Sequence, residues 1–120
     1  MSADFTFPKH VRLLTASDYS NVFQDVQLRV SSKNFLILAR DEGNEHSRLG
    51  IIIAKKNVKL AVERNRLKRQ LRETFRKQRH TLPALEIVLL AKRGADKNDS
   101  LSVARELDFL WQKLKRKASK

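Results

Sequence analysis

The stretch LGIIIAKKNVKLAVERNRLKRQLRETFRKQRHTLPALEIVLLA, residues 49–91, decides the fold. It opens with a β-branched apolar run at 49–54 and closes with another apolar run at 86–91, and both runs predict strands. Between them, residues 58–80 contain neither Gly nor Pro, and Thr81-Leu82-Pro83 ends the segment. One stripe of these residues is apolar at helical spacing: Leu60, Leu67, Leu71 and Phe75. The stretch therefore predicts two strands joined by the longest helix of the chain.

The residues before this stretch predict a short helix and two further strands. Thr15 and Asp18 have the spacing of a capping box, and apolar side chains then recur at helical spacing over about 16–25. Alternation at 28–30 and the apolar run at 35–39 predict strands. The second of these would form an antiparallel hairpin with 49–54 across a long polar loop. Residues 1–14 contain Pro8 and predict an extended arm, whose Phe5 and Phe7 would pack against the body.

The residues after it predict a last helix and a basic tail. The helix is marked by apolar residues at helical spacing: Leu101, Leu107, Leu110, Trp111 and Leu114. Five of the last eight residues, 113–120, are basic, and this stretch is expected to fray into solvent if unbound, with residues 115–120 as a basic C-terminal tail. The order α-β-β-β-α-β-α predicts an α+β two-layer sandwich in which helices cover a four-stranded sheet. We expect one domain over residues 1–120.

The charge balance restricts the partners of the chain. Lys and Arg number 26 against 13 Asp and Glu, a formal net charge of +13. Such a charge favours a polyanion as partner, and nucleic acid ranks ahead of an anionic membrane surface or an acidic protein. Cysteine is absent, which excludes disulfides and thiolate metal sites. The sequence shows neither a signal peptide nor an apolar run long enough to span a membrane, so we expect a cytoplasmic protein.

Most of this charge lies on the long helix and the turn before it. Between Lys55 and Arg79, 11 residues are basic and two are acidic, a net charge of +9. On a helical wheel, a basic stripe borders the apolar one, and both carboxylates, Glu63 and Glu73, miss it. The stripe consists of Asn65, Lys68, Arg69, Arg72, Arg76 and Arg79, and its cations are therefore expected to be unpaired along their own face. An ordinary solvated face would mix charges of both signs at spacings of three and four residues. The stripe therefore predicts a polyanion-binding surface, in which arginine forks bind phosphate and Asn65 binds phosphate, a 2′-hydroxyl or a base.

These residues resemble the signature of the bacterial ribonuclease P protein subunit. The resemblance rests on Lys55-Lys56, Ala61-Val62 and the run from Arg64-Asn65-Arg66 to Arg72-Glu73, and it extends in order over roughly residues 9–114. It implies binding of the catalytic RNA of ribonuclease P, with hydrolysis performed by Mg²⁺ ions held on that RNA. No cofactor would be bound by the protein alone and no protein partner would be required. The implied RNA-binding residues are Lys55, Lys56, Arg64, Asn65, Arg66, Lys68, Arg69 and Arg72.

The same resemblance implies a cleft between the first helix and the sheet that receives the 5′ leader of precursor transfer RNA. The matching residues are Tyr19, Phe23, Leu36 and Leu38. From spacing alone, Tyr19 and Phe23 are as well explained by packing in the core. Leu38 stands where relatives often have an aromatic residue. The family also has a left-handed crossover from the 49–54 strand through the basic helix to the 86–91 strand, against the general right-handed rule.

Other functions remain open from the residues alone. A ribosomal or other structural RNA-binding protein would share the size and charge, and a DNA-binding module is also possible although no known DNA-binding motif is visible. A membrane-surface helix would need its apolar residues free to insert, whereas Leu67, Leu71 and Phe75 are needed to cover the sheet. His10, His46 and His80 are scattered and no paired carboxylates share an element, so we predict neither a catalytic nor a metal site.

Overall fold

The computed structural model describes residues 11–43 and 45–119. Its elements follow the predicted order α-β-β-β-α-β-α, with two short 3₁₀ turns added. They are α1 Ala16–Gln24, β1 Leu28–Ser31, β2 Phe35–Arg40, β3 Arg48–Ile52, α2 Ala61–Gln78, η3 Arg79–Thr81, β4 Glu86–Ala91, η4 Ala95–Lys97 and α3 Ser100–Ala118. The predicted α+β class with a four-stranded sheet is therefore confirmed.

The sheet has the strand order β1-β2-β4-β3. β2 runs antiparallel to both β1 and β4, whereas β3 runs parallel to β4. The predicted hairpin between residues 35–39 and 49–54 is thus wrong, because β4 lies between these strands. β4 is buried at five of its six positions, and the central place in the sheet gives its apolar side chains cover on both faces.

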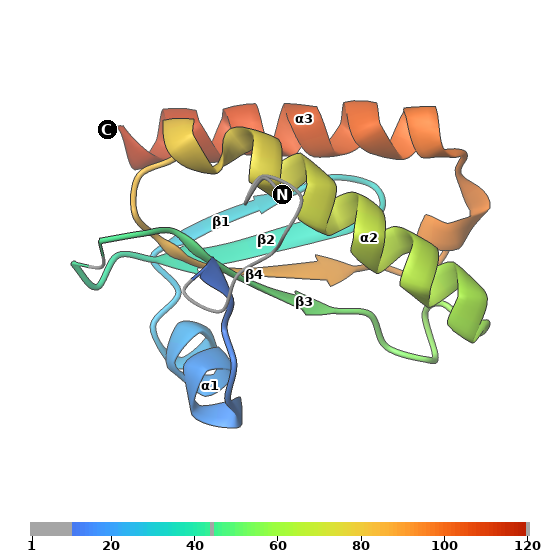
Figure 1. Ribbon diagram of the computed structural model, residues 1–120, viewed down its shortest axis with the longest axis horizontal. Coiled ribbons are helices and arrows are strands. Elements are labelled where there is room, and N and C mark those ends of the chain that lie inside the picture. The colour runs from blue at the N-terminus through green and yellow to red at the C-terminus, as the bar shows by residue number, and fades with distance from the viewer. Residues whose placement is uncertain (1–10, 44, 120) are drawn as a thin grey trace, which may run out of the picture.

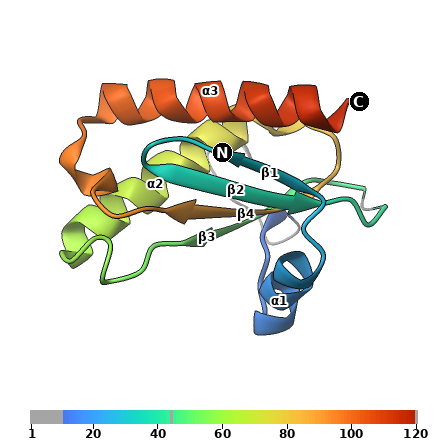
Figure 2. The ribbon, with the colours of Figure 1, turned by 180° about the vertical axis from the view of Figure 1, so that it is seen from behind.

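The connection from β3 through α2 to β4 joins two adjacent parallel strands. Figure 1 shows the sheet nearly edge-on, with α2 above it and with β3 and β4 both pointing to the right. β3 lies nearer the viewer than β4, since the view from behind brings β1 and β2 to the front (Figure 2). The chain therefore runs right along the near strand, returns to the left above the sheet and runs right again along the far strand. The crossover is therefore left-handed, as the family resemblance implied and against the general preference for right-handed connections.

The sheet has unequal cover on its two faces. α2 and α3 lie side by side on one face, and α1 lies alone on the other (Figures 1 and 2). The main core fills the space under α2 and α3, where Phe75 and Trp111 are fully buried with ring centroids 5.9 Å apart. A smaller cluster lies under α1 and consists of Leu13, Val22, Leu38 and Val88. Part of the second face therefore has no helix above it.

α1 begins where the sequence predicted. The Thr15 hydroxyl accepts from the Asp18 amide, and the Asp18 carboxylate accepts from the Thr15 amide, which completes the capping box. Before the helix, Arg12 forms a parallel bridge with Leu49, and the Leu13 amide donates to the Leu49 carbonyl over 3.1 Å. The end of the predicted arm thus lies along the edge of β3. Phe5 and Phe7 lie outside the described residues.

Three predictions about the helices need correction. The residues predicted to fray continue α3 to Ala118, because Lys117 donates to the Arg29 carbonyl and Ala118 packs against the core. Leu60 does not belong to the buried stripe, since α2 starts at Ala61 and Leu60 is 62% exposed. Leu101 is 61% exposed in the first turn of α3. Within the described ranges, none of the helices has the length and hydropathy of a membrane span.

Candidate nucleic-acid interface

Three sides of α2 have different neighbours: the sheet, α3 and solvent. Leu67, Leu71 and Phe75 are fully buried against the sheet. A second side faces α3 and forms hydrogen bonds with it through residues spaced four apart: Gln70, Thr74 and Gln78. The third side, which we call the basic face, consists of Asn65, Lys68, Arg69 and Arg72. The predicted basic stripe thus points away from both the core and α3.

The basic face is accessible along its length. Asn65, Arg69 and Arg72 are exposed, and Lys68 is half-buried. In the described part of the chain, no ion pair joins Lys68 or Arg69 to a carboxylate. Lys55 and Lys56 are exposed in the turn that follows β3. The predicted cations at these positions therefore face solvent and can bind a polyanion.

Arg64 has a structural role that the sequence did not indicate. Its Nη1 atom donates to the carbonyls of Val58 and Lys59, each over 2.9 Å. The N-cap residue of α2, Leu60, provides no side-chain hydrogen bond, so Arg64 fixes the turn that enters the helix. A guanidinium has five N–H donors, so these two hydrogen bonds do not use all of them.

Two arginines of α2 are neutralised by neighbouring carboxylates. Arg66 pairs with Glu63 at 2.8 Å and also donates to the Asp96 carbonyl. Arg76 pairs with Glu73. The expectation that the carboxylates leave every cation of the stripe unpaired is therefore wrong for Arg76, and Arg66 is the weakest of the predicted RNA-binding residues. Both pairs are three residues apart, a spacing at which side chains on a helix meet.

A second group of cations surrounds the start of α2. A hollow of about 360 Å³ is lined by Lys56, Asn57, Lys59, Arg93, Gly94, Asp96 and Lys97. Arg93 and Lys97 belong to the β4–α3 connection and were absent from the predicted site. Gly94 has a φ of +90°, which turns the chain back toward α2 and favours glycine. The sequence shows basic residues next to a glycine at 93–97, but no local pattern indicates that this connection lies beside residues 56–59.

The α1 side brings together three of the four predicted cleft residues. Tyr19 and Leu36 pack, partly buried, against the cluster that contains Leu38, and Leu38 itself is only 6% exposed. Phe23 does not join this cluster and is 44% exposed. Leu38 therefore packs in the cluster under α1, whereas Phe23 presents an exposed aromatic ring on α1.

Tyr19 owes its position to a glycine in β3. A Cβ atom on Gly50 would lie 2.4 Å from a carbon of the Tyr19 ring, so only glycine lets the ring lie against the strand. This close packing holds α1 next to the edge of β3.

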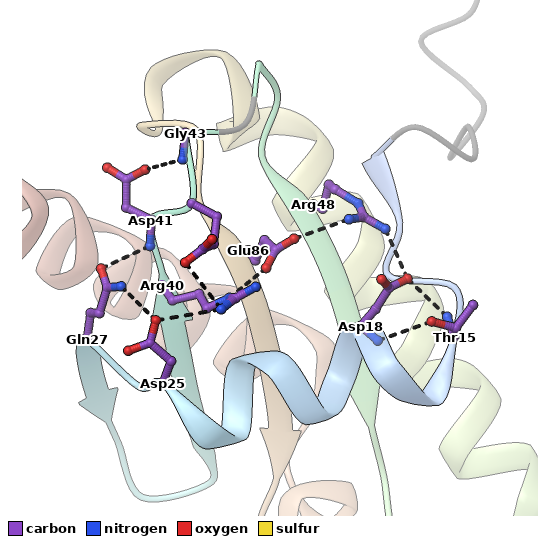
Figure 3. A network of polar contacts seen from close by, with 10 residues as sticks. Thr15, Asp18, Asp25, Gln27, Arg40, Asp41, Gly43, Arg48 and Glu86 are labelled. Atoms are coloured by element: carbon purple, nitrogen blue, oxygen red, sulfur yellow. Dashed lines mark hydrogen bonds and ion pairs between the residues drawn. The ribbon is translucent and has the colours of Figure 1, made fainter.

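A polar network also holds α1 to the sheet (Figure 3). Glu86, which is buried, pairs with Arg40 at 2.8 Å and with Arg48 at 3.2 Å. Arg48 extends across β3 to pair with Asp18 at 3.0 Å and to donate to the Arg12 carbonyl. Burial raises the pKa of Asp18, but the amides of Leu14 and Thr15 and the charge of Arg48 outweigh this effect and lower the pKa overall. The network fixes the first turn of α1 relative to β4.

Within residues 11–43 and 45–119, no three His, Asp or Glu side chains gather as a protein metal site would require. His46 and His80 do line one hollow together, with Glu45 and Arg79 beside them.

The family model and the relatives that match this chain carry the same description. The family model described as Ribonuclease P matches residues 7–115. A ribonuclease P protein component of Marinobacter nauticus is 53% identical over 112 residues, covering 93% of this chain and 84% of the relative. The corresponding protein of Pseudomonas aeruginosa is 44% identical over 110 residues, covering 92% and 82%.

Solved structures agree with this description. The ribonuclease P protein of Staphylococcus aureus superposes with a TM-score of 0.80 at 25% identity and covers 88% of this chain and 95% of its own. That of Thermotoga maritima gives a TM-score of 0.72 at 29% identity, with 84% and 96% covered. The fold described above is thus the fold of these proteins.

Proposed function

The chain belongs to the ribonuclease P protein family, and we propose that its basic face binds the catalytic RNA while the cleft beside α1 receives the 5′ leader of precursor transfer RNA. A member of this family is the accessory subunit of an endoribonuclease whose catalyst is RNA, with a role in 5′ processing of transfer RNA. The proposal assigns the two RNAs to two surfaces of one small domain.

One observation carries the RNA-binding assignment. Lys68 and Arg69 point outward from α2 without a carboxylate partner in the described ranges, next to exposed Asn65 and Arg72. Cations on neighbouring turns repel one another unless an anion lies between them. An RNA backbone provides phosphates at a spacing that several side chains of one helix can reach, and Asn65 adds a group that both donates and accepts.

The leader assignment is supported by accessible apolar surface beside α1. Phe23 is an exposed ring on α1, and Leu36, Ile52 and Leu90 are half-buried on the same face of the sheet. Stacking of bases on exposed aromatic rings does not depend strongly on sequence, which suits a leader that differs from one precursor to the next. Leu38 is too buried to stack on a base, so its role is limited to supporting the floor.

The protein itself performs no hydrolysis in this proposal. Mg²⁺ ions held on the RNA would supply the hydrolytic chemistry, whereas the residues of the protein increase affinity for the precursor and screen phosphate repulsion. We place this activity in the cytoplasm, and no further protein partner is invoked.

The decisive experiment adds the protein to a ribonuclease P RNA at low Mg²⁺ and follows cleavage of precursor transfer RNA. We expect stimulation by the natural protein and much less by a Lys68→Ala, Arg69→Ala, Arg72→Ala triple variant. A triple variant of equal charge loss on α3, Arg105→Ala, Lys113→Ala, Arg116→Ala, is the control and retains stimulation. A ribosomal or other structural RNA-binding protein would give no stimulation at all.

The salt dependence of binding tests the contact type. Each lost phosphate contact lowers the slope of log affinity against log salt by about 0.7–0.9. The α2 variant is expected to lose roughly two to three such contacts, whereas the α3 variant keeps the natural slope. An unchanged slope in the α2 variant contradicts docking through the basic face.

The leader cleft is tested by Phe23→Ala, a change at an exposed ring that leaves the core intact. We expect a smaller preference for precursor over mature transfer RNA, measured as the ratio of the two dissociation constants. Val26→Ala, at another exposed apolar residue near the end of α1, is the matched control. Equal loss of affinity for both RNAs contradicts a leader-specific role.

A further inference from the structure

The first turn of α1 is attached to β3 at two points. Asp18 pairs with Arg48 at 3.0 Å, and the ring of the next residue, Tyr19, lies on Gly50. Arg48 and Gly50 are two residues apart in β3, so they lie on the same face of the sheet. Consecutive residues of the helix thus contact alternate residues of one strand. We call these two contacts, Asp18 with Arg48 and Tyr19 with Gly50, the β3 anchor.

Gly50 provides the space that the Tyr19 ring occupies. A Cβ atom at this position would lie 2.4 Å from Cε1, 2.6 Å from Cζ and 2.8 Å from Oη of Tyr19. Carbon atoms in contact are about 3.5–4.0 Å apart, so any side chain here would displace the ring by roughly 1 Å or more. Gly50 lies within β3, and its φ is not in the left-handed region that favours glycine. The packing of Tyr19, and not the backbone conformation, therefore requires a glycine here.

The β3 anchor also determines where Phe23 lies. Tyr19 and Phe23 are four residues apart, so they lie on the same side of α1, about 6 Å apart along its axis. Within Ala16–Gln24, Val22 is the only buried residue, and Phe23 is 44% exposed. A helix of this length moves as one body, because its backbone hydrogen bonds connect successive turns. A displacement of about 1 Å at Tyr19 is therefore passed on to Phe23.

The proposed leader site combines side chains of two separately attached elements. Phe23 belongs to α1, whereas half-buried residues lie in register across β2, β4 and β3 on the face that carries α1: Leu36, Leu90 and Ile52. A nucleotide that contacts both the helix and the sheet depends on the distance between them. Binding groups must be held within about 0.5 Å of the productive geometry. A change of about 1 Å at the β3 anchor exceeds this tolerance.

We propose that Gly50 is a positioning residue for the 5′ leader. By leaving room for the Tyr19 ring, it fixes the height of α1 above the sheet and with it the place of Phe23. Gly50 itself contacts no RNA in this proposal and acts through Tyr19. The inference rests on the proposed function and concerns the leader alone. The catalytic RNA binds the basic face of α2, so its binding is expected not to depend on the β3 anchor.

Gly50→Ala, in the full protein assembled with ribonuclease P RNA, tests the proposal. The added methyl group either turns the Tyr19 ring away from β3 or raises the first turn of α1, and both outcomes remove the contact that holds α1 against β3. We expect the preference for precursor over mature transfer RNA, the ratio of the two dissociation constants, to fall about fivefold or more, the equivalent of one lost base-stacking contact. Affinity for the catalytic RNA and the salt slope of that binding should stay unchanged.

Gly43→Ala is the matched control. An added Cβ atom at Gly43 meets nothing within 4 Å, and the φ of +73° is unfavourable for alanine. This substitution therefore destabilises the protein without touching α1, and the preference for precursor should keep its natural value. Equal falls in the two variants would mean that lost stability is responsible, and the positioning role would then be rejected.

A double-mutant cycle tests whether Gly50 acts through Tyr19. In a Tyr19→Ala protein the ring that opposes the new methyl group is absent, so adding Gly50→Ala should change the preference by less than about twofold. Two effects that multiply would overturn the proposal. Tyr19 is the only tyrosine of the chain, so a fluorinated tyrosine gives a single fluorine NMR signal from this ring. Gly50→Ala should shift that signal in the free protein, and an unchanged signal would contradict the displacement.

Asp18→Asn is the test if Gly50→Ala does not fold. It removes the charge that pairs with Arg48 and keeps an oxygen that can accept from the Thr15 amide, so it weakens the other half of the β3 anchor. We expect the preference to fall about twofold or more, and a natural preference in the folded variant refutes the proposal. If Phe23→Ala lowers the preference and the anchor variants do not, only the positioning role is lost. If Phe23→Ala also leaves it unchanged, the proposed leader site itself fails.

Discussion

Two groups of basic side chains in this molecule differ in whether a carboxylate of the protein pairs with them. Arg40 and Arg48 converge on the buried carboxylate of Glu86, and Arg48 also reaches Asp18, so their charges are cancelled within the protein. Lys68 and Arg69 on the basic face have no such partner among the described residues. The net charge of +13 therefore comes from basic side chains with two different roles. Paired arginines build the domain, and outward cations serve a ligand.

The difference follows from where carboxylates are placed. Glu86 sits in β4 at the register of Arg40 in β2 and Arg48 in β3, so one residue serves two neighbouring strands. A buried charge without partners is costly, which makes this arrangement all-or-none. On the basic face, solvent hydrates each cation separately and no internal partner is needed for folding.

The largest effect should come from breaking the buried side of this comparison. Glu86→Gln leaves two arginines facing a neutral amide, and loss of one partner of a buried ion pair costs about 3–5 kcal/mol. We expect the free energy of unfolding, measured in urea, to fall by this amount. α1 should also loosen, because Arg48 loses one of the contacts that orient it toward Asp18.

The control for this prediction is Glu63→Gln, which breaks the half-exposed Glu63–Arg66 pair on α2. Pairs of that kind contribute about 0–1 kcal/mol. Equal destabilisation by the two substitutions would refute the distinction between structural and outward cations.

A smaller effect should come from the cap that the network supports. Thr15→Ala removes the hydroxyl that accepts from the Asp18 amide, and loss of such an N-cap costs about 1 kcal/mol. Thermal unfolding should show this loss, with Ser17→Ala at an exposed position of the same helix as the control. A Thr15→Ala protein as stable as the Ser17→Ala protein would mean that the network alone holds α1.

Local sequence patterns predicted the positions of the helices and strands. The capping box at Thr15, the stripe Leu67, Leu71 and Phe75, and the four strand runs all lie where spacing placed them. These features depend on neighbours within four residues, so periodicity alone contains the information. The position of the basic face beside the buried stripe followed from the same helical wheel.

Contacts between distant residues were not predictable in this way. Glu86 meets Arg40 and Arg48 across separations of 46 and 38 residues, and no spacing rule selects those partners. The false hairpin arose for the same reason, because strand runs reveal that a sheet exists but not which strand lies in its centre. The ion pairs of Arg66 and Arg76 could have been predicted from the sequence, because side chains three residues apart meet on any helix.

The pH dependence of stability gives a finer test of the network. The pKa of Asp18 is lowered in the folded protein, although burial acts to raise it, by the Leu14 and Thr15 amides and by Arg48. A carboxyl with a lowered folded pKa stabilises the protein above its unfolded value, here 3.8, and loses this contribution as pH falls through the folded pKa. The natural protein should therefore lose more stability than Asp18→Asn below about pH 4. Parallel pH profiles would exclude Asp18 from the network's energetics.

The smallest effect should come from removing the carboxylate that pairs with one arginine of α2. Glu73→Gln frees Arg76 from its ion pair at the edge of the basic face. The pair is half-exposed, so the free energy of unfolding should change by no more than about 0.5 kcal/mol. RNA affinity should rise, and its salt slope should increase by up to about 0.7–0.9, because Arg76 becomes available to a phosphate. Glu42→Gln, in the loop beyond β2, removes the same charge far from α2 and controls for net charge. Equal gains from both variants would mean that total charge, rather than the side chains that α2 presents, sets RNA affinity.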